Sequence, residues 1–299
     1  MSYVMEEIAS QPDCWAQAVR LSRSEGPLLP ARGEKVAVIG CGTSLFMGQA
    51  YAVMRESAGQ GVTDAFPASE FPVGRRYDRL LAISRSGSTT EVLDVLDEVR
   101  GQLPTVAITA DRSMPIQQYA DQLVGLEFAD EQSVVQTRFA TSTLALLRAH
   151  IGHDLGQVIA DARLAVDAPT PPGAADREQF TYLGRGWTVG LAHEAALKMR
   201  EAALAWAESY PAMEYRHGPI SISDERSVVW ALGQAPPGLA AQVAATSALF
   251  VESRLEPMAD LIRCQLLAVS LAAQRGLDPD RPRHLTRAVV LGSSALQSP

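Results

Sequence analysis

Lysine is almost absent from this sequence of 299 residues. Of the 26 basic residues, only Lys35 and Lys198 are lysines and the rest are arginines. A lysine kept in such a chain indicates a position that needs a compact ammonium and would not accept a planar guanidinium. Lys35 precedes an apolar run and has no evident role, so Lys198 is the position of interest.

Cysteine and long apolar runs are also scarce. The three cysteines are too few for a disulfide framework and too far apart for a zinc site. No segment reaches the ~18 unbroken apolar residues of a membrane-spanning helix, and Glu6 and Glu7 stand where a secretory signal needs basic residues. We therefore expect a cytoplasmic protein with reduced thiols, no metal and no membrane partner.

The charge balance excludes another class of partner. The formal net charge is -8 at pH 7. Binding to nucleic acid needs clustered lysines and arginines that displace counterions from phosphates. We expect no nucleic-acid partner.

The apolar segments predict an α/β protein with parallel sheets. Short runs rich in β-branched residues stop at glycine or polar residues, and segments with helical periodicity follow them. We expect two doubly wound domains, with further helices at about 3–24 and 137–166. The expected strands lie within residues 36–40, 80–84, 104–109, 122–128, 180–184, 227–233 and 249–255.

A segment rich in proline, alanine and glycine divides the chain. We predict an N-terminal helical segment at 1–30, a first domain at 31–167, a linker at 168–178, and a second domain with a C-terminal tail at 179–299. Gly40 and Gly42 fall on Gly184 and Gly186 at an offset of 144 residues. This pattern indicates an internal duplication.

Hydroxyl side chains crowd the junction between the second expected strand and its helix. In the segment SRSGSTTE (84–91), the seven positions 84–90 hold five of them. Ligands collect at the carboxyl ends of parallel strands, and the next helix N-terminus attracts anions. Hydroxyls donate to phosphate, and Gly87 permits close backbone approach. We interpret the loop as a phosphate site, with helix capping as the alternative; GCGTS (40–44) is a second loop of this kind.

One predicted helix carries three charged residues on one side. Glu194, Lys198 and Glu201 recur at i, i+4 and i+7 in HEAALKMREAAL (193–204), which is apolar around most of its circumference. Charges on such a helix are expected to line a cavity or a subunit contact. The alternative is a solvent-exposed face with a Glu–Lys pair.

Two further patterns are interpreted as structural rather than functional. The run GRGWTVG (184–190) has the wrong spacing for a dinucleotide fingerprint, and no acidic residue ends the next strand to hold a ribose. We expect no cofactor. Cys41 stands at a helix start, where a thiol can be activated, but a small buried residue is the commoner meaning.

Five motifs, in order along nearly the whole chain, carry a family resemblance: GCGTS, SRSGSTTE, GRGWTVGLAHEAALKMRE, EYRHGP and DPDRPRHLTRAVV. The chain resembles the SIS (sugar isomerase) family, specifically the isomerase part of glucosamine-6-phosphate synthase and its stand-alone amino-sugar phosphate isomerase and deaminase relatives. The resemblance implies two SIS domains, each a three-layer α/β/α fold of the flavodoxin type. It also implies a homodimer.

The resemblance further implies roles for individual residues. Glu201 would shuttle a proton between sugar carbons, with Lys198 and Glu194 assisting at the sugar. His217 would open the sugar ring, in similar proteins often from the partner subunit. The substrate would be held by residues of the polar loops and the tail, namely Cys41, Gly42, Thr43, Ser44, Ser84, Arg85, Ser86, Gly87, Thr89, Val135 and Arg287.

Three departures from the synthase pattern bear on the activity. The chain has no glutamine-hydrolysing domain and no N-terminal cysteine, so we expect no glutamine-dependent synthesis by this chain alone. Arg287 stands where the family has a lysine, and arginine forms no Schiff base. The run Val135-Gln136-Thr137 stands where the synthase has a serine, a pattern closer to the stand-alone deaminase and deglycase branch.

We therefore expect an isomerase or deaminase that acts on a ketose or amino-sugar 6-phosphate through an enediolate. The alternative from another class is a non-catalytic sugar-phosphate sensor. Such regulators usually carry a DNA-binding helix-turn-helix, and the first 30 residues are too few and too acidic for one.

Overall fold

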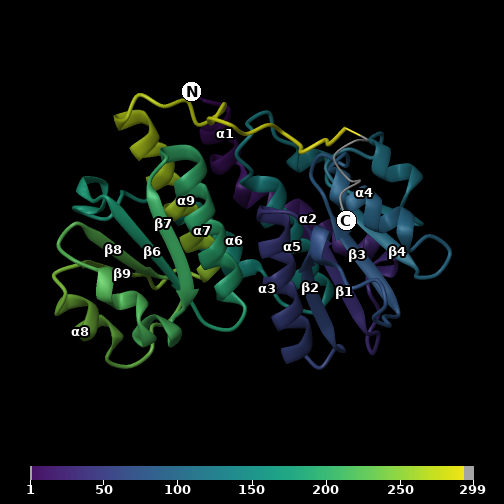
Figure 1. Cartoon of the computed structure of the whole chain (residues 1–299), viewed down its shortest axis with the longest axis horizontal. Helices are drawn as coiled ribbons and strands as arrows, with labels where there is room; N and C mark the ends of the chain where they lie inside the picture. The colour runs from purple at the N-terminus through teal and green to yellow at the C-terminus, as the bar shows by residue number, and fades with distance from the viewer. Residues whose placement is uncertain (1, 293–299) are drawn as a thin grey trace.

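Two parallel β-sheets lie side by side, with helices around them, in the computed structural model, which describes residues 2–292 (Figure 1). The first sheet contains β1 (Val36–Gly40), β2 (Thr63–Pro67), β3 (Arg79–Ile83), β4 (Thr105–Thr109) and β5 (Gln122–Gly125). The second contains β6 (Gln179–Gly184), β7 (Trp206–Pro211), β8 (Ser227–Ala231) and β9 (Leu249–Glu252). The predicted α/β class with parallel sheets is confirmed.

The helices of the described residues connect and cover these strands. They are α1 (Tyr3–Ala9), α2 (Gln11–Glu25), α3 (Thr43–Ser57), α4 (Thr90–Glu98), α5 (Arg138–His150), α6 (Gly156–Val166), α7 (Thr188–Ala203), α8 (Leu239–Ala244) and α9 (Pro257–Gln274). Across residues 2–292, no helix combines the length and the apolar character needed to cross a bilayer.

The strand order is the same in both halves as far as the second sheet extends. The first sheet has the order β2-β1-β3-β4-β5 and the second has β7-β6-β8-β9. In each sheet the second strand in sequence is added on one side of the first strand, and all later strands are added on the other side. Such a reversal opens a crevice at the carboxyl ends of the two strands that flank it, here β1 and β3.

The strands β2 and β7 were not predicted from the sequence. Both are edge strands, and both are mostly half-buried or exposed, so neither carries the continuous apolar run of a central strand. The strand β7 also starts soon after α7, whose C-cap residue is Leu204, with a left-handed φ of 51°, rather than a glycine. The usual helix stop signal is therefore missing there.

One hydrophobic core spans both halves. Val38 on β1, Phe180 on β6 and Trp230 on β8 belong to the same buried cluster, and Ala174 of the predicted linker belongs to it as well. The helices α3 and α7 approach so closely that a Cβ on Gly190 would lie 2.4 Å from the carbonyl oxygen of Phe46. The division into two domains with a linker at 168–178 therefore stays a prediction.

The chain after α9 leaves the second half and crosses to the first. This tail, yellow in Figure 1, runs without regular secondary structure toward the first sheet and α4. The last seven residues of the predicted second domain, 293–299, lie outside the described residues.

Candidate active site

A cavity of about 180 Å³ lies at the crevice between β1 and β3. The two polar loops that follow these strands form part of its wall, α7 forms another part, and the tail closes over it. Eight predicted site residues line the cavity, namely Cys41, Gly42, Thr43, Arg85, Thr89, Lys198, Glu201 and Arg287. The predicted residues that do not line it are Ser44, Ser84, Ser86, Gly87, Val135, Glu194 and His217.

Lys198 forms the centre of the buried wall. Its side chain is 2% exposed. Its Nζ donates to Glu201 Oε2 at 2.6 Å and to Thr43 Oγ1 at 3.0 Å, and it lies 3.4 Å from Glu194 Oε1. Two of the three N–H groups of the ammonium are thus used in hydrogen bonds, and Glu194 is a second ion-pair partner. The lysine therefore joins α7 of the second half to the start of α3 in the first.

The two glutamates differ in their surroundings. Glu194 is completely buried, and its carboxylate accepts no hydrogen bond from any residue in 2–292. Glu201 has a side chain that is 19% exposed and lines the cavity. The prediction that these charges line a cavity rather than a solvated face holds for Lys198 and Glu201, whereas Glu194 lies behind the wall.

Burial and neighbouring charges together shift the pKa values of Glu194 and Lys198. Desolvation raises the pKa of Glu194 to about 7, even though Lys198 and the hydroxyl of Thr43 act in the opposite direction. Burial alone would lower the pKa of Lys198, but the two carboxylates outweigh it and the pKa lies above the ordinary value. Near neutral pH the lysine is therefore charged and Glu194 carries a proton for part of the time.

Among the hydroxyl residues of the 84–90 loop, Thr89 lines the cavity, whereas the hydroxyls of Ser86 and Thr90 accept hydrogen bonds from the amides of Ser88 and Leu291. Thr89 is the N-cap residue of α4, yet its side chain makes no capping hydrogen bond. Its Oγ1 lies 3.3 Å from the hydroxyl of Ser86, and the buried hydroxyl of Ser84 has no partner among the residues described. The capping alternative therefore does not account for these side chains.

Gly87 is explained by packing rather than by ligand approach. Its φ is 59°, and a Cβ there would lie 2.7 Å from the Cβ of Met114 and 2.9 Å from Ile116. Its carbonyl also accepts a hydrogen bond from the amide of Ile116 at 2.9 Å. The reason given from the sequence, close approach to a phosphate, is not needed for this glycine.

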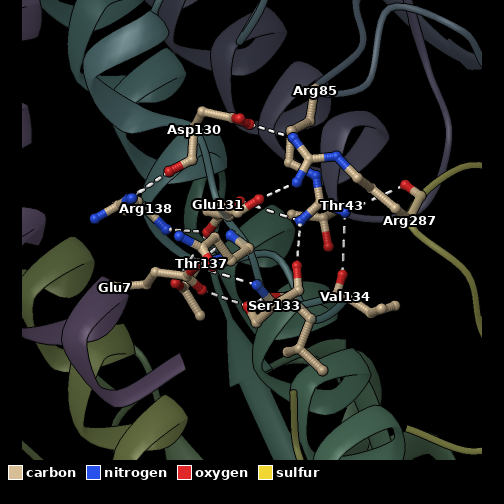
Figure 2. A network of polar contacts seen from close by, with 12 residues as sticks. Glu7, Thr43, Arg85, Asp130, Glu131, Ser133, Val134, Thr137, Arg138 and Arg287 are labelled. Carbon is tan, nitrogen blue, oxygen red and sulfur yellow. Dashed lines mark hydrogen bonds and ion pairs between the residues drawn. The ribbon is translucent and has the colours of Figure 1, made fainter. Parts of the chain in front are cut away.

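Arg85 binds protein groups through both terminal nitrogens of its guanidinium (Figure 2). Its guanidinium is 1% exposed and pairs with Glu131 at 3.3 Å. It also donates to the carbonyl oxygens of Ser133, Val134 and Arg287 at 3.1 to 3.2 Å. Arg85 therefore fixes the 131–137 loop and the tail against the strand β3, which is a positioning role.

The carboxylates of this network hold the same loop from two sides. Glu131 accepts hydrogen bonds from the amides of Thr137 and Arg138 at the start of α5. Glu7 on α1 accepts from the amides of Gln132 and Ser133 (Figure 2). The loop backbone is thus held where the side chain of Gln136 lines the cavity.

The tail is fastened across the cavity. Arg287 pairs with Asp130 and donates to the carbonyl oxygen of Glu131. The first amide of α4, on Thr90, donates to the carbonyl oxygen of Val289 at 3.1 Å. The helix amide predicted to bind phosphate is therefore occupied by the tail in this conformation.

Cys41 lines the cavity and is not an activated nucleophile. Burial raises the pKa of its thiol to about 11, and Glu91 adds to the rise. A thiol with this pKa carries almost no thiolate at neutral pH. The plainer interpretation of Cys41 fits the structure.

His217 lies apart from the cavity in a single chain. It sits on an exposed 3₁₀ turn, Glu214–His217, after β7. Its predicted role in ring opening remains a prediction that requires a second subunit.

Several lining residues were not predicted. The tail contributes Leu285, Thr286, Ala288 and Val289, and the 131–137 loop contributes Val134 and Gln136. All six flank or interleave with predicted residues, so their place in the sequence was the available signal. The amide oxygen of Gln136 is buried without a partner among residues 2–292, which suits a ligand contact.

Comparison with known proteins identifies the first half. Residues 31–151 match the family model for the SIS domain. This part of the chain is a SIS domain. The family predicted from the motifs is therefore confirmed, and the cavity lies at the switch point of the SIS sheet.

Relatives of the SIS domain extend the likeness over the whole chain. The glutamine–fructose-6-phosphate aminotransferase (isomerizing) of Pyrobaculum aerophilum is 26% identical over 97% of this chain, which spans 57% of that relative. The solved glucosamine-6-phosphate deaminase of Thermotoga maritima has a TM-score of 0.78 at 22% identity, covering 97% of this chain and 100% of its own. The tagatose-6-phosphate ketose/aldose isomerase of Escherichia coli has 0.75 at 20%, covering 95% and 97%. These structures share the fold.

The raised pKa of Glu194 predicts a pH-dependent stability. Its folded pKa of about 7 exceeds the ordinary 4.5, so between these values the folded state holds a proton that the unfolded state has released. The stabilisation is complete below pH 4.5 and is lost as the pH rises toward 7, with a slope of about 1.4 kcal/mol per pH unit for one proton. Urea unfolding at pH 5, 6 and 7 should show this loss in the native protein and a weaker one in Glu194→Gln. Parallel profiles would contradict the assignment.

Proposed function

We propose that this chain converts a ketose or amino-sugar 6-phosphate by proton transfer between C1 and C2. In an isomerase this transfer completes the reaction, and in a deaminase water then hydrolyses the resulting imine and ammonia leaves. The observation that carries the proposal is that one cavity is lined by Glu201, Lys198 and the hydroxyl residues Thr43 and Thr89. The names of the two structural neighbours with the same fold, a phosphosugar deaminase and a phosphosugar isomerase, support it.

Glu201 is the proposed base. A general base must reach the proton it removes, and Glu201 lines the cavity whereas Glu194 does not. Glu201 takes the proton from C2 and returns it to C1, or the reverse. The charge of the enediolate falls on the sugar oxygens, where the ammonium of Lys198 stabilises it.

Glu194 is a positioning residue in this scheme. It lies 3.4 Å from Lys198, does not line the cavity, and helps to fix the ammonium between α7 and α3. The proposed place of the phosphate is beside Thr43 and Thr89, which line the same cavity. Hydroxyl donors and the N-terminus of α4 suit an anion there, provided that the tail releases the amide of Thr90.

The second subunit completes the site in this proposal. His217 is exposed and outside the cavity of its own chain, so its ring-opening role requires the cavity of a neighbour. A homodimer in which each subunit contributes His217 to the other satisfies this requirement. No observation specifically supports the alternative of a non-catalytic sensor. Binding alone does not require the group of Glu194, Lys198 and Glu201 beside the cavity.

Replacing the base tests the reaction. The Glu201→Gln variant should lose about 10² to 10⁴ in kcat with glucosamine 6-phosphate or tagatose 6-phosphate, because general base catalysis contributes that much, and should still bind the sugar phosphate. Ammonia release and aldose–ketose conversion are the two assays. The matched control is Glu98→Gln, an exposed carboxylate on α4. Full turnover by Glu201→Gln would remove the proposed base.

Mixing two inactive variants tests the shared site. If Glu201 and His217 of different subunits act together, then mixed dimers of Glu201→Gln and His217→Ala chains contain one intact site. Unfolding and refolding the two together should then restore activity that neither variant has. No recovery, with mixed dimers shown to form, would place His217 outside the neighbour's site.

A further inference from the structure

The 131–137 loop brings one unsatisfied polar group to the cavity. Gln136 lines the cavity, and its buried amide oxygen has no hydrogen-bond partner among residues 2–292. Buried acceptors are normally paired, and a hydroxyl or amino group of a bound sugar supplies a suitable donor. The loop contains neither helix nor strand, so the position of this oxygen depends on contacts from outside the loop.

Glu7 on α1 makes such contacts. It is 3% exposed, and the three hydrogen bonds that its carboxylate accepts within residues 2–292 all come from the loop. The amides of Gln132 and Ser133 donate at 2.6 and 3.2 Å, and the hydroxyl of Ser133 donates to the other oxygen (Figure 2). A buried carboxylate has lost its water and needs donors of this kind. Glu7 is therefore matched to the loop backbone.

Two kinds of contact hold α1 itself in place. The buried side chains of Val4 and Ile8 belong to the hydrophobic core that spans both halves. The amides of Tyr3 and Val4 donate to the carboxylate of Asp280 at 2.9 and 2.8 Å. A helix of seven residues is not stable alone, so these contacts determine where Glu7 lies.

Asp280 also connects α1 to the loop and to the tail. Its carbonyl oxygen accepts a hydrogen bond from the amide of Val134 at 3.1 Å. Glu7 and Asp280 therefore bind three consecutive amides, those of residues 132–134, just before Gln136. The tail continues from Asp280, and its residues 285–289 line the same cavity. One residue thus caps α1, binds the loop and begins the tail.

We propose that Glu7 is a positioning residue for the sugar site and acts on the substrate through Gln136. Glu7 does not line the cavity. It holds the loop so that the amide oxygen of Gln136 accepts a hydrogen bond from the sugar, and Asp280 holds Glu7 through the start of α1. This inference rests on the proposed function, because it takes the ligand of the cavity to be a sugar phosphate.

A double-mutant cycle on ligand affinity tests this inference in the full-length protein. Glu7→Gln replaces one acceptor oxygen by an NH₂ donor, so it leaves part of the loop unsatisfied. Isothermal titration with glucosamine 6-phosphate and tagatose 6-phosphate should show an affinity about 3- to 10-fold lower, the range of one hydrogen bond, and a similar loss in Gln136→Ala. The double variant should lose no more than Gln136→Ala alone, because both changes act on one contact. Additive losses, or native affinity in Glu7→Gln, would overturn the inference.

A neighbouring carboxylate provides the matched control. Glu6→Gln changes an exposed residue of the same helix and should keep the native affinity. If Glu7→Gln does not fold, Asp280→Ala takes its place, since it removes the cap of α1 and leaves Glu7 unchanged. It should lower the affinity in the native background and not in the Gln136→Ala background. Native affinity in Asp280→Ala would then overturn the inference.

Hydrogen exchange without ligand separates this inference from the proposed function. The amides of Gln132 and Ser133 should exchange about 3- to 10-fold faster in Glu7→Gln than in the native protein and in Glu6→Gln, because each loses an acceptor. If they stay protected, Glu7 does not position the loop and only this inference fails. If the native protein binds neither sugar phosphate, the proposed function fails and the inference fails with it.

Discussion

The buried ammonium of Lys198 is the constraint on which the site depends. It is one of two lysines in the chain, and it replaces the water it has lost with a hydroxyl of α3 and two carboxylates of its own helix. Removing one member of such a group leaves an uncompensated buried charge, which typically costs 3–5 kcal/mol. The same contact joins the two halves of the molecule and presents Glu201 to the cavity. Fold and chemistry are thus coupled through a single side chain.

The residues that hold the 131–137 loop and the tail at the cavity are arginines, for a physical reason. Arg85 holds three carbonyl oxygens and a carboxylate at once, and Arg287 bridges Asp130 and the carbonyl of Glu131. A planar fork with five donors can satisfy several backbone acceptors, whereas an ammonium has three donors and a compact charge. Arginines are therefore suited to hold the 131–137 loop and the tail. The rare lysine, Lys198, is suited to the position between two carboxylates.

The sequence predicted the parts of this structure that are local and strongly patterned. Buried strands such as β1 and β4 are continuous apolar runs, and the i, i+4, i+7 spacing placed Lys198 and Glu201 together on α7. Edge strands β2 and β7 lack that pattern. Whether Glu194 faced the cavity or its back could not be predicted, because this depends on how α7 packs on α3. The path of the tail over α4 depends on contacts between residues far apart in sequence, such as Thr90 and Val289.

The most direct measurement is a crystal structure of the protein with an open-chain hexitol 6-phosphate, which mimics the ring-opened sugar. The account predicts phosphate oxygens at about 3 Å from the hydroxyls of Thr43 and Thr89, and the C1–C2 end beside the Glu201 carboxylate and the Lys198 ammonium. A phosphate bound away from both hydroxyls, with the carbon chain directed away from Glu201, would contradict it.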